Sequence, residues 1–179
     1  MVVIDEAYVD FGGESAVKLT EKYENLVVVQ TFSKSRSLAG ARVGFAVASE
    51  ALAADLNRVR NSFNPYNVNR LSALLAANAV LDKAYFEESV AKVKKSREFT
   101  KKELEKRGFT VLDSSANFLM AGSAAIGGEE LYLALKERGI LVRHFKDERI
   151  KNFVRVSIGA KEDMLKFLEE VDDITGRRS

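Results

Sequence analysis

Three residues with chemically versatile side chains, Asp5, Lys34 and Arg42, lie at the ends of short apolar runs. Asp5 and Lys34 are separated by 29 positions, and Lys34 and Arg42 by 8. Functional residues of an α/β sheet gather where its strands end, so we expect an acid, a primary amine and a guanidinium to converge at one sheet edge. Taken singly, each has a plainer interpretation: a turn-forming aspartate, a solvated lysine and half of a surface ion pair.

The elements that must position these side chains begin with a β-α-β pattern. Residues 2–4, 26–29 and 43–48 form apolar runs typical of buried strands, and residues 14–24 are expected to form the helix between the first two. A βαβ unit of this size is expected to be parallel and right-handed. A loop over residues 31–41 then carries Lys34 to the third strand.

Helices dominate the middle of the chain, and strands return near its end. Helices are expected over residues 51–60, 68–81 and 83–107, with a break at Pro65, the single proline. The remainder alternates strands with helices and is expected to form a small two-layer α+β domain. Its predicted strands cover residues 109–112, 118–121, 140–143 and 153–158, and its predicted helices residues 129–138 and 161–174.

Composition excludes several classes of function. The chain has 179 residues, 46% of them apolar, and a net charge of +2, which does not favour nucleic acid or an anionic membrane as a partner. With no cysteine and a single histidine, His144, a metal site is not expected either. No apolar run approaches the roughly 20 residues of a membrane helix, so we expect a soluble, cytoplasmic protein.

Three longer motifs resemble one known family. Asp5-Glu6-Ala7-Tyr8, Thr31-Phe32-Ser33-Lys34 and the run from Leu38 to Phe45 (LAGARVGF) resemble the cofactor region of fold-type I aminotransferases that use pyridoxal 5'-phosphate. Further stretches resemble the histidinol-phosphate aminotransferases within that group, and the resemblance covers nearly the whole chain. These stretches are Tyr8-Val9-Asp10-Phe11, Asn64-Pro65-Tyr66-Asn67-Val68-Asn69 and residues 152–159 (NFVRVSIG).

The resemblance implies a role for each residue of the cofactor region. Lys34 would be the catalytic residue, which bonds to the cofactor aldehyde and moves the substrate α-proton. Asp5 would pair with the pyridinium nitrogen, and Tyr8 would hydrogen-bond the phenolic oxygen of the ring. The cofactor phosphate would be held by Thr31, Ser33 and Arg42.

The resemblance also implies a substrate site and its partners. Arg155 would bind the carboxylate of glutamate (2-oxoglutarate after transfer) or the phosphate of an imidazole-containing substrate. Arg143 would assist, although it is equally well interpreted as a surface cation beside His144, which is interpreted as a solvated or capping side chain. Asn117 resembles a position near the substrate. Homodimerisation or self-association is expected.

The implied fold is α/β, a fragment of the type I large domain with a small C-terminal α+β domain. Residues 1–90 would form part of the cofactor-binding domain, and residues 91–179 the small domain with the linking long helix. Family members are about twice as long, so the chain is expected to be truncated, with apolar strand edges left unpaired. Two alternatives to an aminotransferase remain open: another activity of the same fold, such as decarboxylation of a phosphorylated amino acid, and an inactive chain that folds and self-associates.

Overall fold

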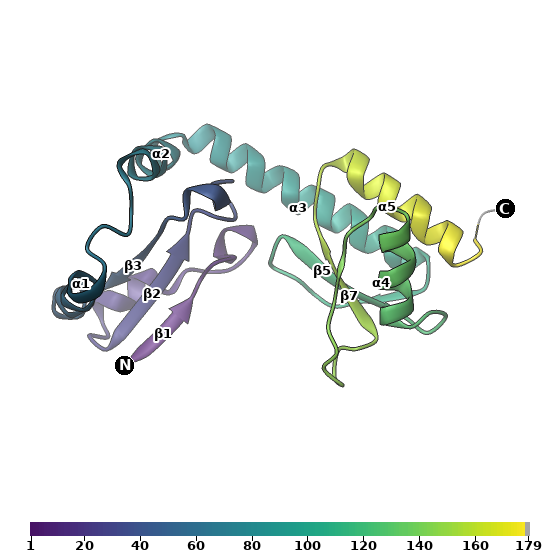
Figure 1. Cartoon of the computed structure of the whole chain (residues 1–179), viewed down its shortest axis with the longest axis horizontal. Coiled ribbons are helices and arrows are strands. Elements are labelled where there is room, and N and C mark those ends of the chain that lie inside the picture. Colours follow the sequence, from purple (N-terminus) through teal and green to yellow (C-terminus); the bar gives the residue numbers. More distant parts are fainter. Residues whose placement is uncertain (178–179) are drawn as a thin grey trace. The chain divides into compact units, whose positions relative to one another are not determined.

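The structure is a computed structural model that describes residues 1–177, and it divides the chain into two compact units. The first unit is Met1–Val90 and the second begins at Ala91. The boundary falls inside α3 (Lys83–Lys106), the longest helix in Figure 1, so the backbone passes from one unit to the other within a helix. Each unit has its own sheet.

In the sheet of the first unit, the ends of two strands and the beginning of the third lie on the same side, here called the sheet edge. It consists of β1 (Val2–Asp5), β2 (Leu26–Thr31) and β3 (Gly44–Ala48) in that order (Figure 1). As predicted, β1 and β2 are parallel, with Asp5 beside Val29. β3 is antiparallel to β2, so its first residue, Gly44, lies beside Thr31, the last residue of β2. The beginning of β3 therefore lies at the same edge as the ends of β1 and β2.

The helices of this unit follow the sheet and begin at polar caps. They are α1 (Glu50–Phe63), α2 (Arg70–Leu81) and the first part of α3. The Ser49 hydroxyl accepts from the amide of Leu52 at the start of α1, and Asn69 Oδ1 accepts from the amide of Ser72 in α2. α1 ends just before Pro65, as the break in the sequence predicts.

The prediction of an α-helix over residues 14–24 is wrong. Only Ala16–Glu21 is helical there, and it is a 3-10 helix. Its two larger apolar residues, Val17 and Leu19, are two positions apart, so they cannot form a stripe along one face of an α-helix. Two further 3-10 turns, Val9–Phe11 and Ala39–Ala41, lie in the loops that follow β1 and precede β3.

The strands of the first sheet are not buried alike. Leu26, Val27 and Val28 of β2 are buried, as their apolar run predicts. Val2 and Val3 of β1, by contrast, are 51% and 55% exposed. The physical reason is the strand order, because β2 is covered by neighbours on both sides whereas β1 and β3 are edge strands within the described residues.

The second unit is a two-layer α+β arrangement. Its sheet has the order β4-β5-β7-β6 with antiparallel pairing throughout. The strands are β4 (Phe109–Val111), β5 (Phe118–Ser123), β6 (Arg143–His144) and β7 (Phe153–Ser157), and the helices are α4 (Gly128–Glu137) and α5 (Lys161–Ile174). Buried side chains of α3, α4 and α5 form one core with alternate residues of β5 and β7, which are Leu119, Ala121, Val154 and Val156.

The predicted strand over residues 140–143 is displaced towards the C-terminus, since β6 is Arg143–His144. The cause is the cap of α4. Gly139 adopts φ 76°, its amide donates to Lys136, and the amide of Ile140 donates to Leu135. This double hydrogen bond is a Schellman motif, and it holds Ile140 in the helix cap rather than in a strand.

The start of β7 depends on a close approach of backbone to Gly128 in α4. A Cβ atom at Gly128 would lie 2.5 Å from the carbonyl oxygen of Lys151 and 3.0 Å from the amide nitrogen of Phe153. We predict that Gly128→Ala lowers the free energy of unfolding by about 1–3 kcal/mol, since backbone atoms must shift. Gly127→Ala is the matched control, because a Cβ there meets nothing within 4 Å, and it should cost less than about 1 kcal/mol. Urea unfolding of both variants measures the difference, and equal losses would contradict this account.

Candidate functional site

The acidic end of β1 presents one carboxylate to solvent. Asp5 is exposed, and its Oδ1 accepts a hydrogen bond of 2.9 Å from the amide of Ala7. This Asx-type turn fixes the direction of the carboxylate, and it is also the plain role that a strand-end aspartate was expected to have. The other carboxylate oxygen accepts no hydrogen bond within residues 1–177, so it is available to a ligand.

The structure brings Lys34 and Tyr8 together. Lys34 Nζ lies 5.4 Å from the centroid of the Tyr8 ring, within the range of a cation–π contact. The loops on which the two residues lie are tied to each other, because the hydroxyl of Ser35 donates to the carboxylate of Asp10. Ser35 is buried and Lys34 is half-buried, so the chain is anchored one residue beyond the amine.

Thr31 and Ser33 shape the turn that leads to Lys34. The Thr31 hydroxyl accepts from the amide of Ser33 at 3.1 Å, and it lies 3.5 Å from the carbonyl of Val43. The amide of Phe32 also donates to Val43, at 3.1 Å. These contacts hold the end of β2 against the segment that opens β3, and thereby keep Arg42 near the same edge.

Arg42 itself adopts a backbone conformation that residues other than glycine rarely use. Its φ and ψ are 54° and 45°, in the left-handed region, which costs on the order of 1 kcal/mol for a residue with a side chain. Its guanidinium is exposed, and Nη1 donates to the carbonyl of Ala39 at 3.0 Å. The turn ends at Gly44, where a Cβ atom would lie 2.8 Å from the carbonyl oxygen of Gln30.

Glu6 is a buried carboxylate that was not predicted as a site residue. It connects the end of β1 to the start of the 3-10 helix Ala16–Glu21 and to β2. Its Oε2 accepts from the Ser15 hydroxyl and from Gln30 Nε2, both at 2.8 Å, and its Oε1 accepts from the Ala16 amide at 2.5 Å. Burial acts to raise the pKa of Glu6, but these three hydrogen bonds outweigh it and hold the pKa below its ordinary value. The only sequence signal was a second acid directly after Asp5.

The second unit groups the predicted substrate residues on the sheet face opposite its core. Arg143 of β6 and Arg155 of β7 are direct cross-strand neighbours, so two like charges share one face. Both guanidinium groups lie near the Phe145 ring, at 5.1 and 6.0 Å, and that of Arg155 also lies 5.2 Å from the Phe118 ring. Arg155 Nε is buried and has no hydrogen-bond partner among the described residues. An unpartnered cationic donor beside a second arginine suits an anionic ligand.

Asn117 immediately precedes β5, the strand whose Met120 pairs with Arg155. Its carbonyl accepts from the amide of Ile158, 2.8 Å away, just after the end of β7. The preceding residue, Ala116, is buried, and its carbonyl accepts from Nη1 of the buried Arg97 at 2.7 Å. Sequence reasoning did not identify Arg97, which holds this turn in place.

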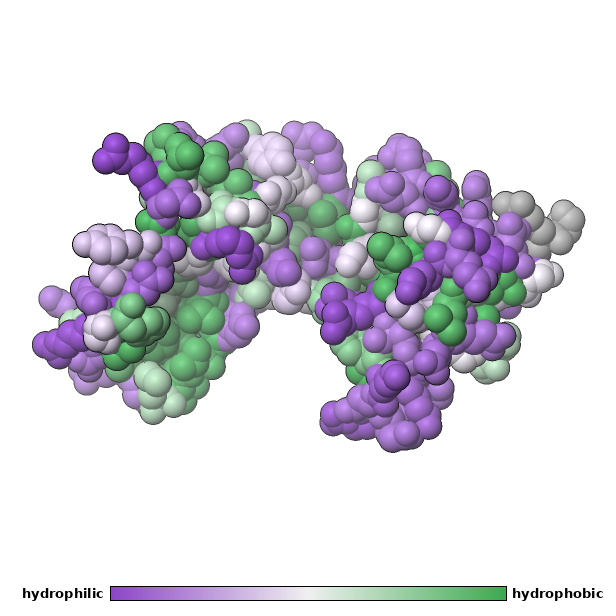
Figure 2. Space-filling model, viewed as in Figure 1, coloured by the Kyte–Doolittle hydropathy of each residue, from purple (hydrophilic) through white to green (hydrophobic). Residues whose placement is uncertain are grey.

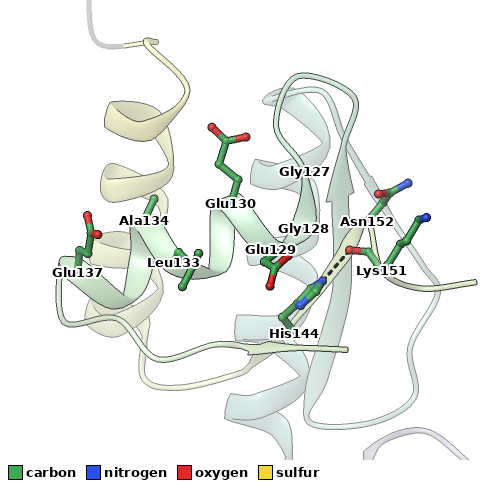
Figure 3. A pocket seen from close by; sticks show the side chains of 10 residues that line it. All are labelled: Gly127, Gly128, Glu129, Glu130, Leu133, Ala134, Glu137, His144, Lys151 and Asn152. Atoms are coloured by element: carbon green, nitrogen blue, oxygen red, sulfur yellow. Dashed lines mark hydrogen bonds between the residues drawn. The ribbon is translucent and has the colours of Figure 1, made fainter. Parts of the chain in front are cut away.

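His144 lies apart from the arginines, because it points to the other face of the sheet. Its Nε2 lies 2.7 Å from the Lys151 carbonyl (Figure 3), and since a carbonyl only accepts, Nε2 carries the proton. The ring also stacks on Tyr132, with a centroid separation of 6.3 Å. It borders a hollow of about 650 Å³ beside α4 that is lined by Glu129, Glu130 and Glu137 among others. His144 is interpreted from the sequence as a solvated or capping side chain, and its bond to the backbone carbonyl of Lys151 is a contact of the capping kind.

The structure therefore gathers the predicted residues into two groups, one in each unit. Asp5, Tyr8, Thr31, Ser33, Lys34 and Arg42 belong to the edge of the first sheet, and Asn117, Arg143 and Arg155 belong to the second unit. Within residues 1–177, no three or more histidine or acidic side chains are grouped so that they could hold a metal ion. Within the same residues, no helix is both long and apolar enough to cross a membrane.

Comparison with known proteins identifies the family. The sequence profile of the family described as aminotransferase class I and II matches residues 1–171. The chain therefore belongs to the class I and II aminotransferases. The expected resemblance is confirmed, and so is the fold class, because the chain has the mixed α/β fold of the type I aminotransferases over about half of their length.

Individual relatives share one enzyme name. The histidinol-phosphate aminotransferase of Brachyspira hyodysenteriae is 52% identical over 172 residues, which are 96% of this chain and 49% of that protein. The crystal structure of the histidinol-phosphate aminotransferase from Clostridium acetobutylicum has a TM-score of 0.89 and 29% identity, and the match covers 99% of this chain and 55% of that one. The enzyme of the same name from Sinorhizobium meliloti, in complex with pyridoxal-5'-phosphate, has a TM-score of 0.85 at 23% identity over 98% of this chain and 49% of that one, a likeness of fold. The chain spans about half the length of the curated relatives it matches.

The buried carboxylate of Glu6 generates a prediction about pH. Because its pKa is lower in the folded chain, its stabilisation is fully present above the ordinary glutamate pKa of 4.5 and is lost as the pH falls through the folded value. Glu6→Gln should lower the free energy of unfolding at pH 7 by about 1–3 kcal/mol. It should also flatten the fall in stability between about pH 5 and pH 3.

Urea unfolding across this pH range measures both effects, and Glu14→Gln is the control because Glu14 is exposed in the same segment. If the Glu6→Gln and Glu14→Gln curves keep the same pH slope as the unsubstituted chain, Glu6 does not have the role assigned to it.

Proposed function

We propose that this chain carries the cofactor-anchoring and substrate-anion residues of a pyridoxal-phosphate-dependent aminotransferase of the histidinol-phosphate type. The observation that carries the proposal is the half-buried amine of Lys34, which faces Tyr8 at the same sheet edge as Asp5 and Arg42. The family membership and the 52% identity to a histidinol-phosphate aminotransferase support it.

The side chains at this edge fit the cofactor by their chemistry. An aldehyde requires an amine, a ring nitrogen that must stay protonated requires a carboxylate, and a phosphate requires hydroxyl and guanidinium donors. The free oxygen of Asp5, the amine of Lys34 and the donors on Thr31, Ser33 and Arg42 supply each of these. When bound, pyridoxal phosphate supplies an electron-accepting ring that stabilises negative charge on the substrate α-carbon.

Five residues of the chain would hold the cofactor in place, and Lys34 would both hold it and transfer a proton. Lys34 Nζ would hold the cofactor through its aldehyde carbon, with loss of water, and the amine that the amino substrate displaces would take the proton from the substrate α-carbon. Asp5 would pair with the ring nitrogen of the cofactor, and the Tyr8 hydroxyl would hydrogen-bond the phenolic oxygen of the ring. Thr31, Ser33 and Arg42 bind the phosphate and so fix the ring in register with Lys34.

Arg155 and Arg143 would bind the anionic group of the substrate. A planar guanidinium meets two oxygens of a carboxylate or phosphate at once, and the buried Nε of Arg155 lacks any other acceptor within the described residues. Asn117, at the neighbouring strand end, would contact the substrate beside it. The proposed amino donor is glutamate, which becomes 2-oxoglutarate, and the proposed acceptor is an imidazole-containing keto phosphate.

The test is covalent trapping of pyridoxal phosphate on the 179-residue chain with borohydride, followed by peptide mapping. We expect Lys34 to be labelled in preference to the other lysines, and Lys34→Ala to remove that site without unfolding the chain. Lys22→Ala is a matched control, because Lys22 Nζ lies 5.2 Å from the Tyr23 ring but away from the sheet edge. Labelling of Lys34 at the same level as Lys22 would favour the inactive alternative.

Self-association, as a homodimer in the cytoplasm, is part of the proposal. The outer edges of β1 and β3 are unpaired among the described residues, and Val3 and Phe45 on these strands are exposed. Leu71 and Leu81 of α2 are also exposed, and Figure 2 shows hydrophobic side chains gathered on the first unit. Open apolar edges of this kind favour strand addition or burial against another copy.

We predict that the chain is not monomeric at micromolar concentration and that Val3→Lys shifts it towards monomer, since a charge on an edge strand opposes pairing. Light scattering over a dilution series measures the change. Leu133→Lys, an equally apolar position on α4 of the second unit, is the control and should leave the distribution unchanged. A stable monomer before any substitution would contradict the prediction.

A further inference from the structure

Arg36, two residues after Lys34, connects the Lys34 loop to two helices of the same unit. Its Nη1 donates to the carbonyl of Ala79 in α2 at 2.7 Å. Its guanidinium carbon lies 4.2 Å from the centroid of the Phe86 ring in α3 and 5.9 Å from that of Phe32. A single side chain thus makes a charge-assisted hydrogen bond and a close cation–π contact on two different helices.

These contacts matter because they cross an open space between the loop and the helices. A hollow of about 570 Å³ lies between them and is lined by Ser37 and Leu38 from the loop and by Leu75 and Tyr85 from the helices. Apolar packing is therefore incomplete on this side of the loop. Arg36 reaches from the loop across this hollow to the two helices.

Backbone hydrogen bonds close the part of the loop that follows Lys34. The amide of Ser37 donates to Lys34 at 3.2 Å, and the amide of Leu38 donates to Phe32 at 3.0 Å. Ser37 has φ 57°, an unfavourable conformation for a residue with a side chain, which surrounding contacts must maintain. The bond from Ser35 to Asp10 fixes the other side of the loop.

We propose that Arg36 is a positioning residue that holds the Lys34 amine in place by clamping its loop to α2 and α3. This inference rests on the proposed function, since the amine it positions is the one assigned to the cofactor. Arginine is required because a lysine ammonium cannot stack flat on Phe86 while also donating to Ala79. Removing the clamp should loosen residues 35–38 and leave the sheet intact.

The experiment uses the 179-residue chain with Arg36→Met and Arg36→Lys. Arg58→Met is the matched control, because Arg58 is an exposed arginine of the same unit whose ion pair is with Asp55, three residues away on the same helix. Hydrogen exchange at the amides of Ser37 and Leu38 measures loop opening, and borohydride trapping of pyridoxal phosphate measures labelling of Lys34 relative to Lys22. The ratio within one molecule is insensitive to a general loss of stability.

In Arg36→Met, we expect exchange at Ser37 and Leu38 to accelerate about tenfold, with Val28 in β2 unchanged. The ratio of Lys34 to Lys22 labelling should fall by about tenfold, and Arg36→Lys should restore only part of it. Arg58→Met should alter neither quantity.

The outcomes separate this inference from the proposed function. If the unsubstituted chain labels Lys34 preferentially and Arg36→Met keeps that preference, the positioning role is overturned while the proposed function stands. If the unsubstituted chain shows no preference, the cofactor assignment fails, and with it the link from Arg36 to the cofactor. Unchanged exchange at Ser37 and Leu38 would overturn the clamp in either case.

Discussion

The pairing of β2 with a strand on each side is the constraint on which the first unit depends. β2 is its one strand with neighbours on both sides, and Leu26, Val27 and Val28 are its buried residues. These three residues are consecutive, so β2 is covered on both of its faces, and it pairs with β1 and β3 in one defined register. Once that register is set, Asp5 lies beside Val29 and Gly44 beside Thr31, so the polar loops of three strands meet at one edge.

Strand direction explains why the arginine joins the acid and the amine. Had β3 run parallel to β2, the residues that open it would lie at the far edge of the sheet, away from Lys34. The chain instead reverses within the loop between β2 and β3. The left-handed backbone of Arg42 and the close approach at Gly44 lie where that reversal returns to the sheet. Local strain at Arg42 is thus the cost of placing a third chemical group at the edge.

Much of this arrangement was predictable from the sequence, and the failures have physical causes. The strands and long helices follow from apolar runs and from 3.6-residue periodicity, and the caps at Gly108 and Gly139 have the positive φ that their positions suggest. The 3-10 helix at Ala16–Glu21 could not be predicted, because its start is fixed by the carboxylate of Glu6, ten residues away. The shift of β6 likewise depends on a cap that uses Ile140.

Contacts between residues distant in sequence also limited what could be predicted about the candidate site. Residue type and spacing indicated Asp5, Lys34 and Arg42, and the family resemblance indicated Arg155, but periodicity carries no information about which polar residue reaches across to a neighbouring element. Glu6, Arg36 and Arg97 have their partners on segments that are distant in sequence. Only the folded structure distinguishes them from solvated charges.

Some candidate residues of the site have an anchored residue directly next to them in the sequence. Glu6 follows Asp5, Ser35 follows Lys34, and Ala116, bound by Arg97, precedes Asn117. In each pair the supporting residue is buried and hydrogen-bonded, while its neighbour is exposed or half-buried. Asp5 ends a strand, where adjacent side chains point to opposite sides, so a Glu6 side chain that is anchored inward leaves Asp5 facing outward. Lys34 and Asn117 lie in turns, where the hydrogen bonds of the adjacent residue hold the backbone. A buried and hydrogen-bonded residue next to each of these candidates therefore holds the backbone, and this is why the chain can expose an acid, an amine and an amide without leaving their backbone loose.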